Sequence, residues 1–140
     1  MKPGKQLLGY GYVGTTTRRD AVSNAPQDIE QITAVAADYI EGWYSGDTER
    51  MDRCLHTDLV KRIPLSDSGE LGTVTKARML ELTAAGGGDA VDPDFETVVH
   101  QVSGEIATAT VSSPEYVDLL QLARAKSGWK IVNVLFRNRD

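Results

Sequence analysis

The stretch YVDLLQLARAKSGWKIVNVLF, residues 116–136, decides the fold. Its two halves are rich in Leu, Val, Ile and aromatic residues, and a Ser-Gly turn signal at 127–128 separates them. This pattern is typical of two antiparallel strands joined by a tight turn. In the second strand, alternation is expected to place Trp129, Ile131 and Leu135 on one face. Because both faces of both strands are apolar, we expect helices to cover one side of the sheet and a second subunit to cover part of the other.

Upstream of this stretch, the sequence predicts helices first and most of the strands later. An apolar stripe at three- and four-residue steps predicts a helix that is capped at Ser23 or Asn24 and ends at Gly46. Asp47 is expected to cap a second, short helix, and Thr75 to start a third. This order indicates a segregated α+β domain. Further strands are expected at residues 59–65, 95–102 and 106–112.

A chain of 140 residues fits one domain that can bury a sizeable core. Residues 1–24 are expected to form an arm or tail, and residues 25–140 the folded domain. The arm contains a GxGxxG motif at Gly9, Gly11 and Gly14. A dinucleotide site needs a buried strand before this motif and a helix that opens at its last glycine. The neighbouring residues favour neither, so we expect no dinucleotide cofactor.

The composition excludes several kinds of partner. A net charge of -5 argues against a nucleic-acid partner, which needs a basic face. No run approaches the roughly 20 apolar residues of a membrane span, and the N-terminus is a poor signal peptide. A cytoplasmic protein with no membrane partner is therefore expected. Cys54, His56 and His100 lack the spacing of a metal site, so no metal and no cofactor are predicted.

Four segments carry a resemblance to a known superfamily. They are DYIEGWYSGDTERM (38–51), LHTDLVKR (55–62), YVDLLQL (116–122) and GWKIVNVLF (128–136). Over residues 28–137 the chain resembles the NTF2-like superfamily, and within it the group labelled "putative lumazine-binding", or SnoaL-like. The resemblance implies a cone-shaped α+β fold, in which three N-terminal helices pack on a curved, mixed, mainly antiparallel sheet around a small-molecule pocket. It implies no single function, because the superfamily includes enzymes, carriers and non-catalytic domains.

Ketosteroid isomerases share this fold, and three of their site positions can be located in this sequence. Their oxyanion is held by a tyrosine late in the first helix and a neutral aspartic acid on a late strand, which fall on Tyr39 and Asp118. Their general base precedes a proline at the end of the first strand, where this chain has Ile63. Isoleucine cannot accept a proton. The resemblance thus implies a polar pair, Tyr39 and Asp118, that binds a ligand oxygen without the isomerase base.

The leading hypothesis is a homodimer, paired through its sheet, in which each domain binds a small molecule. An enzyme of the isomerase, dehydratase or cyclase kind is one alternative, with Asp118, His100 or His56 transferring protons. Two titratable groups within hydrogen-bond distance at one concave site would favour it. A protein-interaction module is the other alternative. The residues expected to contact the ligand are Tyr39, Trp43, Ile63, Tyr116 and Asp118.

Overall fold

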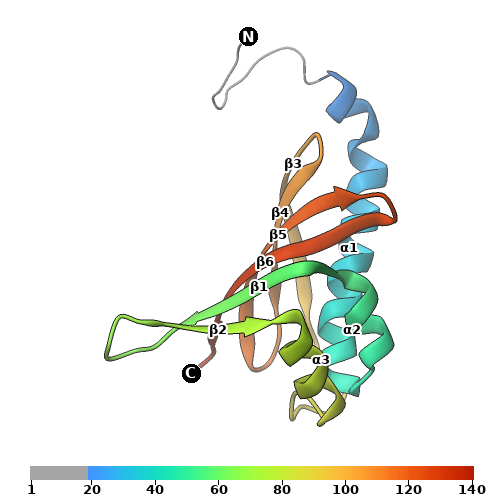
Figure 1. The fold of residues 1–140 in the computed structure, drawn as a ribbon. Helices are drawn as coiled ribbons and strands as arrows, with labels where there is room; N and C mark the ends of the chain where they lie inside the picture. The colour runs from blue at the N-terminus through green and yellow to red at the C-terminus, as the bar shows by residue number, and fades with distance from the viewer. Residues whose placement is uncertain (1–18) are drawn as a thin grey trace.

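The computed structural model describes residues 19–140, with side chains from residue 26 onward. The GxGxxG motif and the other residues before Arg19 lie outside this range, so an N-terminal arm stays a prediction. Figure 1 shows the described chain as a sheet with three helices on one side. The elements are α1 (Arg19–Ser45), α2 (Thr48–Cys54), β1 (Leu55–Pro64), β2 (Leu71–Thr75), α3 (Lys76–Ala84), β3 (Glu96–Ser103), β4 (Ile106–Ser112), β5 (Tyr116–Ala125) and β6 (Gly128–Asn138).

The first helix is longer than the sequence predicted. It begins at Arg19, before the expected cap at Ser23 or Asn24, and Pro26 lies inside it rather than in its first turn. Proline removes one backbone hydrogen bond from a helix interior, but its fixed φ is compatible with a helix. No glycine precedes it in α1. Residues 19–24 are therefore helical in the structure.

The predicted caps of the two shorter helices are confirmed. The Asp47 carboxylate accepts hydrogen bonds from the backbone N–H groups of Glu49 and Arg50, both at 3.1 Å. The Thr75 hydroxyl accepts one from the N–H of Arg78 at 3.2 Å. These bonds satisfy donors that have no partner within the helix. The helices are not all N-terminal, however, because α3 follows β1 and β2 in the chain.

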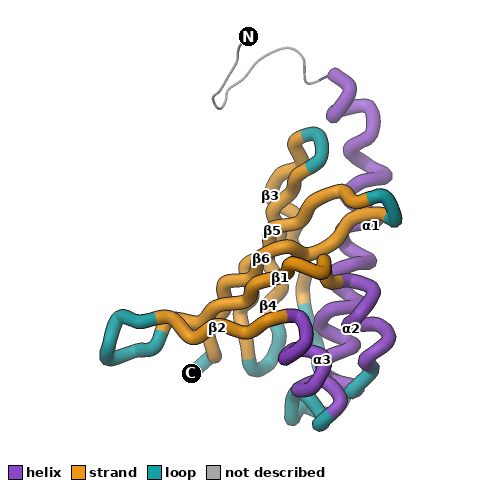
Figure 2. The backbone as a smooth tube through the Cα atoms, in the orientation of Figure 1, coloured by secondary structure: helices purple, strands orange, loops and turns teal. Residues whose placement is uncertain are grey.

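The described strands form one six-stranded sheet in the order β2-β1-β6-β5-β4-β3. β1 pairs with β6 in parallel, and the other neighbouring pairs are antiparallel. The predicted α+β class with a mixed, mainly antiparallel sheet is confirmed. β2 was not predicted; it lies at the sheet edge, where it pairs with β1. Figure 2 shows the β1–β2 hairpin reaching away from the helices.

A β-bulge in β6 overturns the predicted face of Leu135. Ile131 and Asn133 pair with consecutive residues of β5, so β6 carries one extra residue between them. Such a residue reverses the alternation of the side chains that follow it. Val134 is therefore buried on the helix side with Ile131, whereas Leu135 is 45% exposed on the opposite face.

The core fills the space between the helices and the sheet face that they cover. The buried stripe of α1 recurs at three- and four-residue steps, as the sequence predicted. Among the helices described, none is long and apolar enough to cross a membrane. The largest fully buried apolar side chains are those of Ile32, Tyr39, Ile40, Met51, Leu55, Met79, Leu120, Leu122 and Ile131.

Asp28 ties α1 to the β5–β6 hairpin. Its carboxylate, which is buried, accepts hydrogen bonds from Arg124 Nη2 at 3.0 Å and from Trp129 Nε1 at 3.2 Å. Asp28→Ala leaves the buried indole N–H without a partner, so we expect it to lower the free energy of unfolding by about 2–3 kcal/mol. Asp58→Ala, at a side chain that is 90% exposed, is the control; it should change stability by about 0.5 kcal/mol at most. Urea unfolding measures both, and equal losses would contradict the prediction.

Candidate functional site

Two hollows lie on opposite faces of the sheet. The inner cavity, of about 180 Å³, lies between the helices and the sheet, and the outer groove, of about 720 Å³, lies on the face away from the helices. The inner cavity is the candidate site because ionisable groups are buried in it. It is lined by Tyr39, Ile40 and Trp43 of α1, Lys61 of β1, Val74 of β2, Met79 and Leu82 of α3, Tyr116 and Asp118 of β5, and Phe136 and Asn138 of β6.

Three elements bring one polar side chain each to the buried end of the inner cavity. Tyr39 lies on the buried stripe of α1. Lys61 shares the inward face of β1 with Leu59, and Asp118 shares the inward face of β5 with Leu120. In both strands these residues alternate with more exposed ones, as expected when one face of a sheet is covered. Asn138, by contrast, is exposed, so the cavity runs from this buried end toward solvent.

These three side chains form a chain of hydrogen bonds, here called the Lys61–Tyr39–Asp118 network. Lys61 Nζ donates to Tyr39 Oη at 2.6 Å, and that hydroxyl donates to Asp118 Oδ1 at 2.8 Å. Lys61 Nζ lies 3.7 Å from the same carboxylate oxygen. Exposure is 8% for Lys61, 2% for Tyr39 and 1% for Asp118. Tyr39 and Asp118 thus meet as a polar pair, but the tyrosine hydroxyl donates to the carboxylate rather than into the cavity.

Burial shifts the proton affinities of the network. It lowers the pKa of Lys61, although the nearby Asp118 carboxylate opposes the shift. It raises the pKa of Asp118, although Lys61 and the Tyr39 hydrogen bond oppose that shift. The pKa of Tyr39 lies well above its usual value because of burial and the adjacent carboxylate. Transfer of a proton from Lys61 to Asp118 therefore costs less here than in water.

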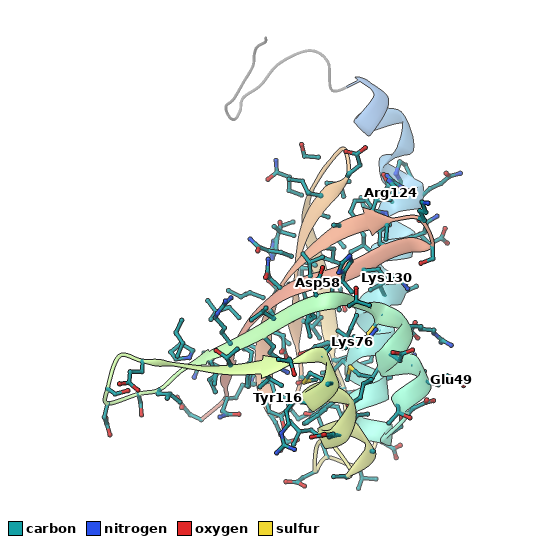
Figure 3. The ribbon with its side chains drawn as sticks, viewed as in Figure 1. Glu49, Asp58, Lys76, Tyr116, Arg124 and Lys130 are labelled. Atoms are coloured by element: carbon teal, nitrogen blue, oxygen red, sulfur yellow. The ribbon has the colours of Figure 1, made fainter. Side chains whose placement is uncertain are left out.

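Aromatic rings surround the charged end of Lys61. Its Nζ lies 4.3 Å from the ring centre of Phe136, 5.1 Å from that of Tyr39 and 5.6 Å from that of Trp43. The rings of Phe136 and Trp43 can attract a cation at such distances through their electron-rich faces, whereas Tyr39 meets Nζ at its hydroxyl edge. Trp43 Nε1 also donates to the Tyr116 hydroxyl at 3.3 Å. Tyr116, which is labelled in Figure 3, lines the inner cavity together with Met79 and Leu82 of α3.

Lys61 is the buried titratable residue of the inner cavity that sequence reasoning missed. Leu59, Lys61 and Ile63 alternate along β1, so the available signal was a lysine between two apolar residues of one strand face. Ile63 lies on that face and is only partly buried, but it is not among the residues that line the inner cavity. The isomerase base position thus adds no side chain to the cavity. Lys61, a titratable residue two positions earlier on β1, lines the cavity instead.

The two histidines lie outside the inner cavity. His56 is at the start of β1, where its Nδ1 accepts a hydrogen bond from the backbone N–H of Asp58 at 3.0 Å. His100 lies on β3 and lines the outer groove, with Nε2 2.6 Å from Thr110 Oγ1. Of the three proton-transfer candidates, the structure therefore places only Asp118 in the cavity, among the described residues. Cys54 is buried, and burial raises its thiol pKa to about 12, which disfavours the reactive thiolate.

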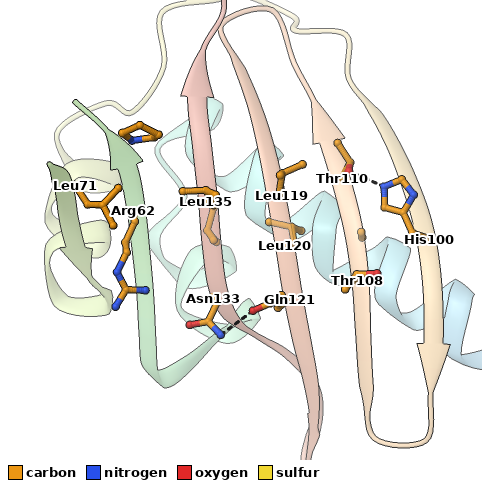
Figure 4. Close-up of a pocket in the computed structure, with 13 residues that line it drawn as sticks. Arg62, Leu71, His100, Thr108, Thr110, Leu119, Leu120, Gln121, Asn133 and Leu135 are labelled. Carbon is orange, nitrogen blue, oxygen red and sulfur yellow. Dashed lines mark hydrogen bonds between the residues drawn. The ribbon is translucent and has the colours of Figure 1, made fainter. Parts of the chain in front are cut away.

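The outer groove crosses the sheet face that the helices leave uncovered. Figure 4 shows its side chains standing in front of the sheet, with the helices behind. Leu119 and Leu135 are cross-strand partners at its centre and are 49% and 45% exposed. Gln121 and Asn133 are joined by a side-chain hydrogen bond of 3.0 Å. This hollow is wider than the inner cavity, but it contains no buried charge.

Comparison with protein families matches residues 27–137 to the family described as "Putative lumazine-binding". Because the match spans most of the chain, the protein belongs to this family. Comparison with curated protein sequences finds no match.

Solved structures show the same fold. An NTF2-like protein of unknown function from Silicibacter pomeroyi is 21% identical, with a TM-score of 0.72 over 82% of this chain and 98% of that one. One from Methylobacillus flagellatus is 22% identical, with a TM-score of 0.69 over 81% and 94%. A ketosteroid isomerase-like protein from Erwinia carotovora atroseptica is 17% identical, with a TM-score of 0.61 over 81% and 98%. These likenesses show that the chain has the same fold as these three proteins.

Proposed function

We propose that this member of the "Putative lumazine-binding" family binds a small, single-ring ligand in the inner cavity, with Lys61 contacting a ligand oxygen. The observation that carries the proposal is the Lys61–Tyr39–Asp118 network, buried at the end of a cavity with mostly apolar walls. A buried ammonium and carboxylate stabilise a fold less than apolar side chains of the same size. Ionisable groups kept in such a place are therefore typical of a functional site.

The volume of the cavity supports a ligand of one ring. In another protein, an apolar cavity of about 150 Å³ binds benzene. The inner cavity, at about 180 Å³, has room for one ring and a polar substituent. Lumazine, which the family description names, is a fused two-ring compound, and its entry would require the cavity to widen. Trp43, Phe136 and Leu82 supply apolar walls against which a flat ring can pack.

The test compares benzyl alcohol with ethylbenzene, which has the same shape without the hydroxyl. We expect the protein to prefer benzyl alcohol, and the double variant Lys61→Met/Asp118→Leu to lose that preference. A hydrogen bond to a charged group is worth about 1.5–3 kcal/mol, which corresponds to roughly tenfold or more in affinity. Titrations followed by NMR give both dissociation constants, and lumazine is titrated alongside. An unchanged preference in the double variant would overturn the proposal.

A second candidate function is an enzyme that moves a proton on a small carbonyl compound. The observation that favours it is that Lys61, Tyr39 and Asp118 are titratable groups within hydrogen-bond distance at one concave site. Acetophenone, a single-ring ketone, is a suitable probe. In deuterated water, the parent protein should exchange the methyl hydrogens of acetophenone for deuterium faster than the variant Lys61→Met/Asp118→Leu does. Equal exchange rates, measured by NMR, would remove this candidate.

We also propose that two copies of the chain pair through the outer groove. The exposed leucines Leu119 and Leu135 lie side by side on a face that none of the described helices covers, and such a patch is typical of an isologous contact. Leu119→Lys should therefore shift the protein to monomer in analytical ultracentrifugation. Ile29→Lys, at an equally exposed apolar residue of α1, is the control and should leave the dimer intact. A monomeric parent protein would contradict this proposal.

A further inference from the structure

Lys61 combines three features that a carbonyl-trapping amine requires. Its Nζ lines a cavity, it is joined through Tyr39 to a group that can take its proton, and its surroundings hold it in one place. Most lysines of a folded protein extend into water as ammonium ions, which have no lone pair to attack a carbonyl carbon. Burial favours the neutral amine and so moves Lys61 toward the nucleophilic form.

We propose that Lys61 forms a covalent imine with a small aldehyde or ketone that enters the inner cavity. The inference rests on the proposed function, because the carbonyl compound must first occupy that cavity. It also names the ligand class: a carbonyl group at the buried end, attached to one ring or to an apolar chain of similar size.

The hydrogen bonds of the network supply a path for the proton. Tyr39 Oη accepts from Lys61 and donates to Asp118, so a proton can pass from the ammonium to the carboxylate through the hydroxyl. The neutral Nζ then bonds to the carbonyl carbon, and one of its two hydrogens moves to the carbonyl oxygen. Asp118 returns the first proton to the resulting hydroxyl, which leaves as water. One ammonium and one carbonyl thus give one iminium ion and one water, with no oxidant or reductant.

The same surroundings stabilise the product. An iminium nitrogen carries the positive charge that the ammonium carried, and the rings of Phe136 and Trp43 already lie near that position. Asp118, which is a carboxylate again at the end of the sequence, lies beside it as counter-ion. The apolar walls limit the access of water, which would otherwise hydrolyse the iminium.

The test traps the iminium by reduction. The full-length protein is incubated at neutral pH with benzaldehyde and sodium cyanoborohydride, and the benzylated lysines are located by tandem mass spectrometry. Lys126, an exposed lysine between β5 and β6, is the internal comparison. Burial lowers the pKa of Lys61 and so raises the fraction of its neutral amine, and the inner cavity holds the aldehyde beside Nζ, so we expect Lys61 to be labelled faster than Lys126. Tyr39→Phe should slow the labelling of Lys61 but not that of Lys126.

Labelling of Lys61 no faster than that of Lys126 would overturn the inference. The variant Lys61→Met/Asp118→Leu, which keeps the cavity apolar, should lose the fast labelling at position 61 and keep the slower labelling of Lys126. Benzyl alcohol separates this inference from the proposed function, since it has no carbonyl group and can only bind reversibly. If benzyl alcohol binds and Lys61 is not labelled, the imine is wrong and the binding function stands. If benzyl alcohol does not bind, the proposed function fails as well.

Discussion

Asp118→Leu should lower the free energy of unfolding by about 3–5 kcal/mol, because it leaves the Lys61 ammonium buried without a counter-ion. Lys61 is 8% exposed and its nearest carboxylate oxygen is that of Asp118, 3.7 Å away. Lys61→Met alone should also be destabilising, since it leaves the carboxylate unpaired except for the Tyr39 hydroxyl. Equilibrium unfolding in urea measures both losses.

The double variant Lys61→Met/Asp118→Leu is the control for this prediction. It replaces both charges by apolar side chains of similar size, but it leaves the buried Tyr39 hydroxyl without its two partners, at a cost of about 1–3 kcal/mol. Its stability should therefore lie close to that of the parent protein, well above the sum of the two single losses. The two single losses are thus expected to be far from additive. If the double variant is as unstable as the sum of the single variants, the two charges do not form a coupled pair.

The two single variants should also respond to pH in opposite directions. In Asp118→Leu, burial keeps the pKa of Lys61 below the value of about 10.4 for an unfolded lysine. Between these two pKa values the unfolded chain binds more protons than the folded protein. Stability then rises as pH rises. In Lys61→Met, burial keeps the pKa of Asp118 above the unfolded value of about 3.9. Between these two pKa values the folded protein holds the proton, so stability falls as pH rises. Parallel slopes would contradict the assigned burial of both groups.

Gly87→Ala should lower the free energy of unfolding by about 3 kcal/mol or more, because the new methyl group has no space and the backbone conformation is unfavourable. Gly87 has φ +56°, and a Cβ there would lie 1.9 Å from the carbonyl oxygen of Trp43. The loop after α3 thus packs directly on the end of α1 that supplies a wall of the inner cavity. The variant should therefore also weaken the binding of benzyl alcohol.

Gly69→Ala is the matched control for the loop. Gly69 has a similar φ of +75°, but a Cβ there would meet no atom within 4 Å. Only the left-handed backbone then opposes alanine, at about 1–2 kcal/mol. Both variants are compared by urea unfolding, and equal losses would show that the loop does not rest on Trp43.

Local signals in the sequence predicted most of the fold. The caps at Asp47 and Thr75 depend on residues next to the helices that they start, and periodicity marked the strands of the C-terminal half. The bulge in β6 and the edge strand β2 were not predicted, because both depend on pairing between strands. An extra residue opposite β5 is invisible in β6 alone, and the five residues of β2 acquire their partners only when β1 is beside them.

The candidate site was predictable only in part, for a similar reason. Tyr39 and Asp118 could be located from a family pattern, and in the structure Tyr39 Oη lies 2.8 Å from Asp118 Oδ1. Lys61 could not, because a lysine in a strand is ordinarily exposed. Its burial follows from the side of β1 that the parallel pairing with β6 turns toward α1. That long-range contact converts a common surface residue into the charged group at the buried end of the cavity.

The most direct test of the central claim is a crystal structure of the protein with benzyl alcohol. The predicted result is one ring in the inner cavity, between Trp43 and Phe136, with its hydroxyl within hydrogen-bond distance of Lys61 Nζ. A molecule bound only in the outer groove, or an inner cavity that stays empty at saturating alcohol, would contradict the claim.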